Sequence, residues 1–152
     1  MKVNIQNIRD VKIPGVEVVF AEDVPISEAV DHFECTTWPL LTAFQSNEIV
    51  CGKMEGWHHV PVYENVEYHY DAEIFYMVSG TALMYFVDLD ENDNVLMETA
   101  QVVRIPAGTL FNVAAHKGHW VPVAEGDTYF ALVVAPKQGD IHLPLPEAIE
   151  GV

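Results

Sequence analysis

The residues best suited to chemistry in this chain lie in one stretch, EYHYDAEIFYMVSG, which runs from residue 67 to residue 80. Glu67 and His69 stand two positions apart, so on a β-strand their side chains point to the same side and can converge on one ligand. Glu73 follows and opens an apolar run. Two carboxylates and an imidazole offer oxygen and nitrogen donors that suit Zn, Fe, Mn, Co or Ni. The stretch therefore predicts a site for a divalent transition metal.

Glu73 can also act on a substrate rather than only hold a metal. A carboxylate serves as a general base when burial brings its pKa near neutrality. The alternative is a metal-free polar pocket in which Glu67 and His69 form a hydrogen-bonded pair. Both interpretations follow from one physical requirement. Carboxylates and imidazoles that face an apolar interior must be paired or metal-bound to offset their desolvation.

Two further side chains are candidates for contacting a substrate. His58 stands beside His59, and strand neighbours face opposite sides, so only one of the two can reach an interior. Arg104 lies at the end of an apolar run, and in a chain with only 7 basic side chains it is a candidate clamp for a carboxylate. The ordinary alternatives are a surface histidine for His58 and a surface ion pair for Arg104.

Short apolar runs separated by Gly, Pro and Asp turns must position these residues, and this pattern is typical of an all-β sandwich or barrel. A short helix over residues 26–33 is the only helical pattern, with Ser27 as its N-cap. The tail from Pro136 should be extended, with a last turn near residues 147–150. The predicted strands cover residues 3–8, 16–22, 40–44, 48–54, 56–63, 66–70, 73–78, 82–89, 95–105, 109–115, 119–124 and 128–135.

Length and composition predict one domain over residues 1–152, with a barrel core over about 38–136 on which the N-terminal segments and the C-terminal tail pack. An excess of 23 acidic over 7 basic side chains repels phosphate backbones and argues against nucleic-acid binding. The chain has no apolar run long enough for a membrane span and no signal-peptide pattern. Cys35 and Cys51 form no metal-binding spacing, so we expect reduced thiols and a cytoplasmic protein.

The spacing His69, three residues, Glu73, six residues, Gly80 resembles the first motif of the cupin superfamily. That motif has a histidine two positions before His69, where this chain has Glu67. A glutamate can still bind a metal through oxygen. The resemblance implies a single-domain jelly-roll barrel, or double-stranded β-helix, with little helix. It also implies a homodimer, since cupin sheets often pair.

The second cupin motif is only partly kept. Pro106 and Gly108 match it, whereas Ala100, Phe111 and Ala115 stand at its remaining three positions. Phe111 replaces the histidine that normally completes the metal site and cannot bind an ion, so a fourth ligand must come from elsewhere or be absent.

A histidine further along the chain is the candidate for that fourth ligand. His119 begins the run HWVPV, which resembles what normally follows the second-motif histidine, and on this basis the expected metal ligands are Glu67, His69, Glu73 and His119. His116 lies three positions earlier on the same loop and is the competitor, as a ligand or a substrate contact.

A narrower resemblance is to the ureidoglycolate lyase family, small cupin-like enzymes that release urea and glyoxylate. The segments Glu67-Tyr68-His69, His119-Trp120-Val121-Pro122 and TYFALVVAPKQGD are similar to elements of that family. This resemblance implies a metal-dependent enzyme with lyase-type chemistry on a small hydroxy acid or sugar acid. Isomerase and dioxygenase chemistry are also compatible with these residue types. The alternative from another class is a non-catalytic cupin that binds a small carboxylate or sugar.

Overall fold

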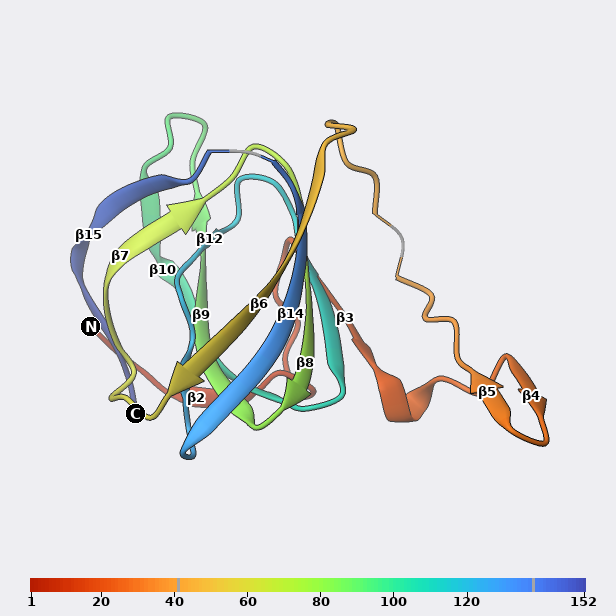
Figure 1. Cartoon of the computed structure of the whole chain (residues 1–152). Helices are drawn as coiled ribbons and strands as arrows, with labels where there is room; N and C mark the ends of the chain where they lie inside the picture. Colours follow the sequence, from red (N-terminus) through yellow and green to blue (C-terminus); the bar gives the residue numbers. More distant parts are fainter. Residues whose placement is uncertain (41, 138) are drawn as a thin grey trace.

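The chain forms two facing β-sheets that make a nearly closed barrel (Figure 1). In the computed structural model, residues 1–40, 42–137 and 139–152 are described. The elements, in chain order, are β1 (Lys2–Val3), β2 (Ile5–Asn7), β3 (Val16–Phe20), the 3-10 turn η1 (Ala21–Asp23), β4 (Glu28–Val30), β5 (Phe33–Cys35), β6 (Ile49–Trp57), β7 (Val62–Tyr68), β8 (Glu73–Ser79), β9 (Thr81–Leu89), β10 (Val95–Pro106), β11 (Thr109–Val113), β12 (Gly118–His119), β13 (Val123–Ala124), β14 (Thr128–Pro136) and β15 (Ile141–Gly151).

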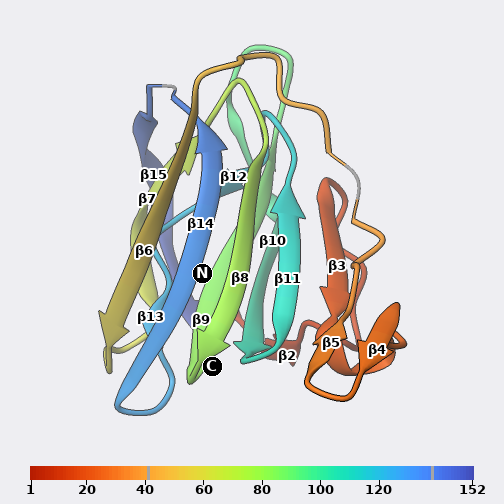
Figure 2. The same ribbon diagram turned by 45° about the vertical axis from the view of Figure 1, so that its right-hand side comes forward.

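The larger sheet has eight strands and the smaller has five. The larger runs in the order β1-β15-β7-β12-β9-β10-β2, with β13 also paired to β9, and the smaller runs β3-β11-β8-β14-β6 (Figure 2). Strands β4 and β5 form a separate two-stranded ribbon. Neighbours along the chain often lie in different sheets, which is the arrangement expected of a jelly roll. The predicted all-β class is confirmed.

The interior is filled by every second side chain of the strands that cross it. On β8, Phe75 and Met77 are buried, and on β9, Met84 and Phe86 join them in the same cluster. Phe111 stacks on Phe75 with ring centroids 4.9 Å apart. Burying a side chain of this size stabilises the fold by roughly 1.5–3 kcal/mol. Because alternate residues of a strand face opposite sides, these apolar positions fix which residues of the same strands can face the outside.

Three local expectations are wrong. Residues 26–33 form no helix but the β4–β5 hairpin, in which Val30 pairs with Phe33. A helix there would have relied on one apolar face packing on the barrel, and the segment instead projects away from it (Figure 1). The predicted strand over residues 40–44 is absent at the described positions 40 and 42–44, and Leu41 lies outside the described residues.

The third wrong expectation concerns the tail. The tail is extended as predicted, but β15 continues through residues 147–150 as a strand rather than a turn. Ile149 pairs with Tyr63 on β7, and Glu150 pairs with Lys2 on β1. Pairing on both sides supplies the backbone hydrogen bonds that an isolated turn would otherwise have made. The domain limits 1–152 and the core limits 38–136 stay predictions.

Among the described residues, no helix is long and apolar enough to cross a membrane.

The turn between β8 and β9 depends on Gly80. Its φ is +74°, and a Cβ added there would lie 2.2 Å from the backbone oxygen of Thr128. Gly108, in the turn between β10 and β11, has a φ of +81° but nothing within 4 Å of an added Cβ. A substitution at Gly108 therefore tests the effect of the left-handed backbone alone, and one at Gly80 tests that effect together with steric overlap.

We expect Gly80→Ala to lower the free energy of unfolding by more than Gly108→Ala, measured by urea titration. Gly108→Ala should cost roughly 1–2 kcal/mol, from the left-handed backbone alone. Gly80→Ala adds the overlap with Thr128, so strand β14 must move. Gly126→Ala is the control, because an added Cβ meets nothing within 4 Å there. Equal losses at Gly80 and Gly108 would contradict the tight contact described for this turn.

Candidate active site

Four of the predicted site residues come together at one end of the barrel. Glu67 lies on β7, His69 directly follows that strand, Glu73 opens β8 and His119 ends β12. Strand β12 is inserted between β7 and β9, and in this register His119 pairs with Glu67. A cavity of about 300 Å³ opens beside them, lined by Met54, Glu67, His69, Glu73, Phe75, Met84, His119, Trp120, Val121, Pro122, Val133 and Asp140.

The turn that brings His69 and Glu73 together is held by Asp71. This buried carboxylate accepts a hydrogen bond from the backbone N–H of Ala72 at 2.8 Å and another from that of Gln45 at 2.8 Å. Such local bonds from an aspartate side chain favour a tight turn over a continued strand. The turn at Asp71 therefore sets the positions of His69 and Glu73, which lie two residues before and two residues after it.

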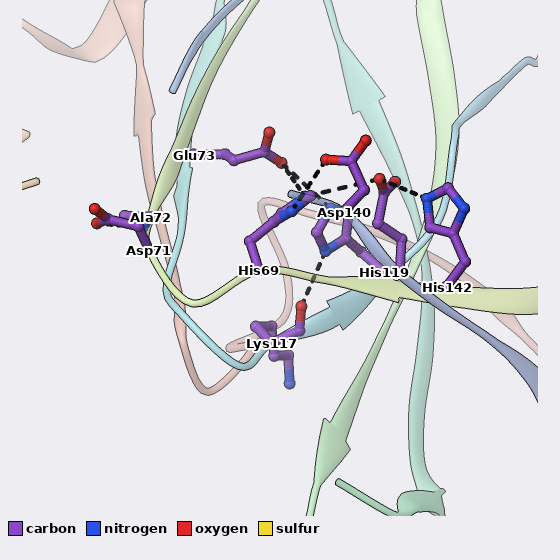
Figure 3. A network of polar contacts seen from close by, with 9 residues as sticks. His69, Asp71, Ala72, Glu73, Lys117, His119, Asp140 and His142 are labelled. Carbon is purple, nitrogen blue, oxygen red and sulfur yellow. Dashed lines mark hydrogen bonds and ion pairs between the residues drawn. The ribbon is translucent and has the colours of Figure 1, made fainter. Parts of the chain in front are cut away.

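The side chains of the cluster are within contact distance of one another (Figure 3). The Nε2 of His69 lies 3.1 Å from Oε2 of Glu73 and 3.9 Å from Oε1 of Glu67. The Nε2 of His119 lies 3.4 Å from the same Oε2 of Glu73. Ligand atoms of Glu67, His69 and His119 all lie within 4.8 Å of one another. The four residues predicted as metal ligands thus form one cluster, and their binding of a metal stays a prediction.

The ring of His119 is held in one orientation. Its Nδ1 is 2.9 Å from the backbone oxygen of Lys117, a carbonyl that can only accept, so Nδ1 carries the proton and donates. In the neutral ring this leaves the lone pair of Nε2 directed at the cluster, whereas only the protonated ring can donate from Nε2 to the carboxylate of Glu73. Lys117 is itself buried and fixed by an ion pair to Asp88 at 2.6 Å. A metal-binding histidine is typically held in this way through its other nitrogen.

The ring of His69, unlike that of His119, is not held by a hydrogen bond from Nδ1 among the described residues. The side chain is 5% exposed, and this Nδ1 is buried. The nearest acidic atom is Oδ1 of Asp140, 3.5 Å away. A carboxylate at this position can orient the imidazole and raise its basicity.

Charge pairing within the cluster governs its protonation. Burial alone would raise the pKa of Glu73, but hydrogen bonds and charge from His119 and His69 outweigh it and lower the pKa to about 2. Burial works against the charged form of His69, yet Glu73, Glu67 and Asp140 together raise its pKa above the ordinary value. In the metal-free protein the carboxylate of Glu73 is therefore ionised at neutral pH, and its pKa is not near neutrality as its burial alone would have suggested.

The C-terminal tail contributes two residues that the sequence did not reveal as part of the site, Asp140 and His142. The Nε2 of His142 lies 3.0 Å from Oε1 of Glu67, and its ring lies 5.1 Å from that of Trp120. Asp140, His142 and Glu67 also have ligand atoms within 4.8 Å of one another. The alternation of Asp140 and His142 along an extended segment was a usable signal, since such residues face one side.

The three predicted substrate contacts lie elsewhere in the described structure. Arg104 forms a bidentate ion pair with Glu125, with its Nε 2.8 Å from Oε1. The Nδ1 of His58 is 3.1 Å from the backbone oxygen of the same Glu125. His116 has its Nδ1 3.5 Å from Asp93 and is half exposed. None of the three is among the residues that line the cavity described above, and their contact with a substrate stays a prediction.

Comparisons with known proteins support the fold. No protein-family model matches the chain, and no curated protein matches it in sequence. RmlC from Streptococcus suis, solved in complex with dTDP-D-xylose, superposes with a TM-score of 0.56 at 11% identity, covering 90% of this chain and 71% of that chain. A dTDP sugar isomerase from Desulfovibrio desulfuricans G20 gives a TM-score of 0.47 at 13% identity over 92% and 85% of the two chains.

The chain has the RmlC-like cupin fold, and the predicted jelly-roll barrel is confirmed. Within that fold, Glu67 and the two buried histidines His69 and His119 have ligand atoms within 4.8 Å of one another and could hold a metal ion. The narrower resemblance to the ureidoglycolate lyase family is not shown by these comparisons.

The pairing of Glu73 predicts how the stability of the metal-free protein depends on pH. A carboxylate whose pKa is lowered on folding stabilises the protein above its ordinary pKa of 4.5, and this contribution is lost as the pH falls toward about 2. Glu73→Gln should therefore cost about 1.5–3 kcal/mol near pH 6, and the difference from wild type should shrink through the acid range.

The measurement is urea unfolding at several pH values in the presence of a chelator. Glu64→Gln, at an exposed position of β7, is the control and should change little. A difference between Glu73→Gln and wild type that stays constant down to pH 2 would contradict the pairing.

Proposed function

We propose that this protein is a small metal-dependent cupin enzyme whose divalent transition metal is held by Glu67, His69 and His119, with Glu73 beside them as a fourth ligand or as the base. The observation that carries the proposal is the convergence of the three ligand atoms within 4.8 Å, with both histidines buried and all three residues lining the cavity. We infer that its substrate is a small polar metabolite, a hydroxy acid or a sugar acid.

The residues present fit such an ion. Nitrogen and carboxylate oxygen donors are those that Zn, Mn, Fe, Co and Ni accept in proteins. His119 already directs Nε2 at the cluster because its Nδ1 donates to the Lys117 carbonyl at 2.9 Å. The Nδ1 of His69, which makes no hydrogen bond in the described parts of the chain, lies 3.5 Å from Oδ1 of Asp140, a carboxylate placed to orient the ring.

A bound divalent ion would supply a Lewis acid for a carbonyl or hydroxyl oxygen of the substrate. It would also give an anionic substrate a positive centre, which the chain itself hardly offers, with a formal net charge of −16. The ammonium group of Lys117, two residues before His119, is paired with Asp88 at 2.6 Å.

The cavity wall sets what can bind. A volume of about 300 Å³ is at the small end of ligand sites and suits a metabolite of few heavy atoms. Phe75, Met84 and Pro122 add apolar side chains to the lining of the same cavity. Such side chains exclude water and strengthen the electrostatic interactions of the cluster with a substrate.

Glu73 is the residue placed to move a proton. Its Oε2 lies next to both histidines, its side chain lines the cavity, and it is ionised. Because pairing with the histidines lowers its pKa to about 2, it can take a proton from a substrate hydroxyl only where a bound ion would make that hydroxyl more acidic. In lyase-type chemistry on ureidoglycolate, removal of the hydroxyl proton forms the C=O of glyoxylate as the C–N bond breaks. The leaving urea nitrogen then takes up a proton, which His69 or Glu73 can return.

A second candidate function is a metal-free binding module. The observation that favours it is that Glu73 already contacts both histidines, at 3.1 and 3.4 Å, so the cluster is largely paired without an ion. In that case the cavity would bind a neutral sugar or a small acid, with Trp120 as one wall. Metal content separates the two functions.

We expect the purified protein to contain close to one equivalent of a transition metal, measured by elemental analysis. His119→Ala and His69→Ala should each lose most of it, because a missing ligand typically lowers metal affinity by more than the 10–100-fold seen for supporting residues. His116→Ala is the matched control on the same loop. Less than about a tenth of an equivalent, with no uptake on addition, would instead support the binding module.

The reaction itself can be assayed directly. With metal bound, the wild type should release equal amounts of urea and glyoxylate from ureidoglycolate. Glu73→Gln should reduce kcat by roughly 10²–10⁴-fold, the range expected for loss of a general base. If the metal is present but ureidoglycolate is untouched, the substrate is a different hydroxy acid or sugar acid and the lyase resemblance is wrong.

A further inference from the structure

A row of three polar side chains crosses three neighbouring strands at the cavity end of the larger sheet. In the order β15-β7-β12, Glu67 on β7 pairs with His119 on one side and with His142 on the other. Residues directly opposite each other on paired strands point to the same face. Glu67 therefore stands between two imidazoles, and the metal site proposed above uses only the one from β12.

The imidazole on β15 already has the spacing of a shared ligand. The Nε2 of His142 lies 3.0 Å from Oε1 of Glu67. Two donors that each bind one ion at about 2.1 Å lie roughly 3 Å apart, so an ion can bind both with little movement. The indole of Trp120 packs on the ring of His142, with centroids 5.1 Å apart, and restricts its orientation.

Asp140 supplies a third donor. Ligand atoms of Asp140, His142 and Glu67 all lie within 4.8 Å of one another. A hydrogen bond between Glu67 and His142 needs no second carboxylate, and two carboxylates this close repel each other unless a cation lies between them. Figure 3 shows Asp140 and His142 beside the buried histidines of the first group.

A buried nitrogen points at this second group. The Nδ1 of His69 belongs to a side chain that is only 5% exposed, and it has no hydrogen-bond partner among the described residues. It lies 3.5 Å from Oδ1 of Asp140. Because a carboxylate has two oxygens, Asp140 can accept from this nitrogen with one and bind an ion with the other. An ion on Asp140 would hold the carboxylate in place and so give His69 the support that it lacks.

The charge of the cluster favours a second ion. The ion pairs of Glu67, Glu73 and Asp140 are all with histidines in the described parts of the chain. Counting the three carboxylates alone, one divalent ion leaves the cluster negative, whereas a second makes it positive. A hydroxy acid or sugar acid is an anion and the chain has a formal net charge of −16, so a positive cluster attracts it where a negative one does not.

We propose that Glu67, Asp140 and His142 hold a second divalent transition metal at the mouth of the cavity, with Glu67 shared between the two ions. This inference rests on the proposed function, because the first ion occupies the other side of Glu67. Paired metal ions bridged by a carboxylate commonly clamp two oxygens of one substrate. Asp140 lines the cavity, so the second ion borders it and binds the carboxylate of the substrate.

The test is calorimetric titration of the chelator-stripped, full-length protein with Co²⁺. Wild type should bind two equivalents, the second at least about tenfold more weakly, because Asp140 and His142 are 57% and 53% exposed and are less preorganised than the buried ligands. His142→Phe keeps a ring beside Trp120 but has no ligand atom. It should weaken the second equivalent by at least about tenfold and leave the first, and His142→Ala should do the same. His59→Ala, which removes an exposed histidine elsewhere, is the matched control and should keep both equivalents.

His119→Ala separates the two sites. It should lose the tighter equivalent and keep a weaker one on Glu67, Asp140 and His142. A wild type that binds a single equivalent, unaffected in both His142 variants, would overturn the second site and leave the proposed function standing. A second equivalent that both His142 variants bind as tightly as wild type is Co²⁺ on other surface groups and would also overturn it. A wild type that binds no Co²⁺ would overturn the second site and the proposed metal enzyme together.

Discussion

The site depends on the insertion of one very short strand, β12, between β7 and β9. Gly118 makes this insertion possible, because a Cβ at that position would lie 2.7 Å from Val87 and 2.9 Å from Val66. Only a residue without a side chain lets the backbone pass between those two strands. The next residue, His119, then lies opposite Glu67 in the register of the sheet. Backbone pairing thus brings together two residues that are far apart in the sequence.

A residue that departs from the second cupin motif, Phe111, belongs to the apolar core. Phe111 stands where that motif has its histidine, and in this chain it is a buried core residue stacked on Phe75 at 4.9 Å. A ligand at that position would face the apolar cluster rather than the cavity. His119 occupies the other side of the cluster instead, in contact with Glu73. The cluster thus contains a histidine at position 119, and position 111 belongs to the core.

Much of the fold followed from the sequence, because alternating apolar residues and turn residues are local signals. The segments around residues 73–78, 82–89 and 128–135 were predicted as strands and are strands. The β4–β5 hairpin was not predicted, since its apolar residues fit a helical face equally well and no local signal shows that it leaves the barrel. Glu67, His69 and Glu73 were found from their spacing. Asp140 and His142 were missed because only tertiary folding brings the tail beside Glu67.

The proposed metal site is tested most directly by diffraction from crystals of the protein loaded with cobalt, using the anomalous signal of the ion. We expect one strong peak within ligand distance of Nε2 of His69, Nε2 of His119 and a carboxylate oxygen of Glu67. A cavity without a peak, or with the ion bound only by residues outside this cluster, would contradict it.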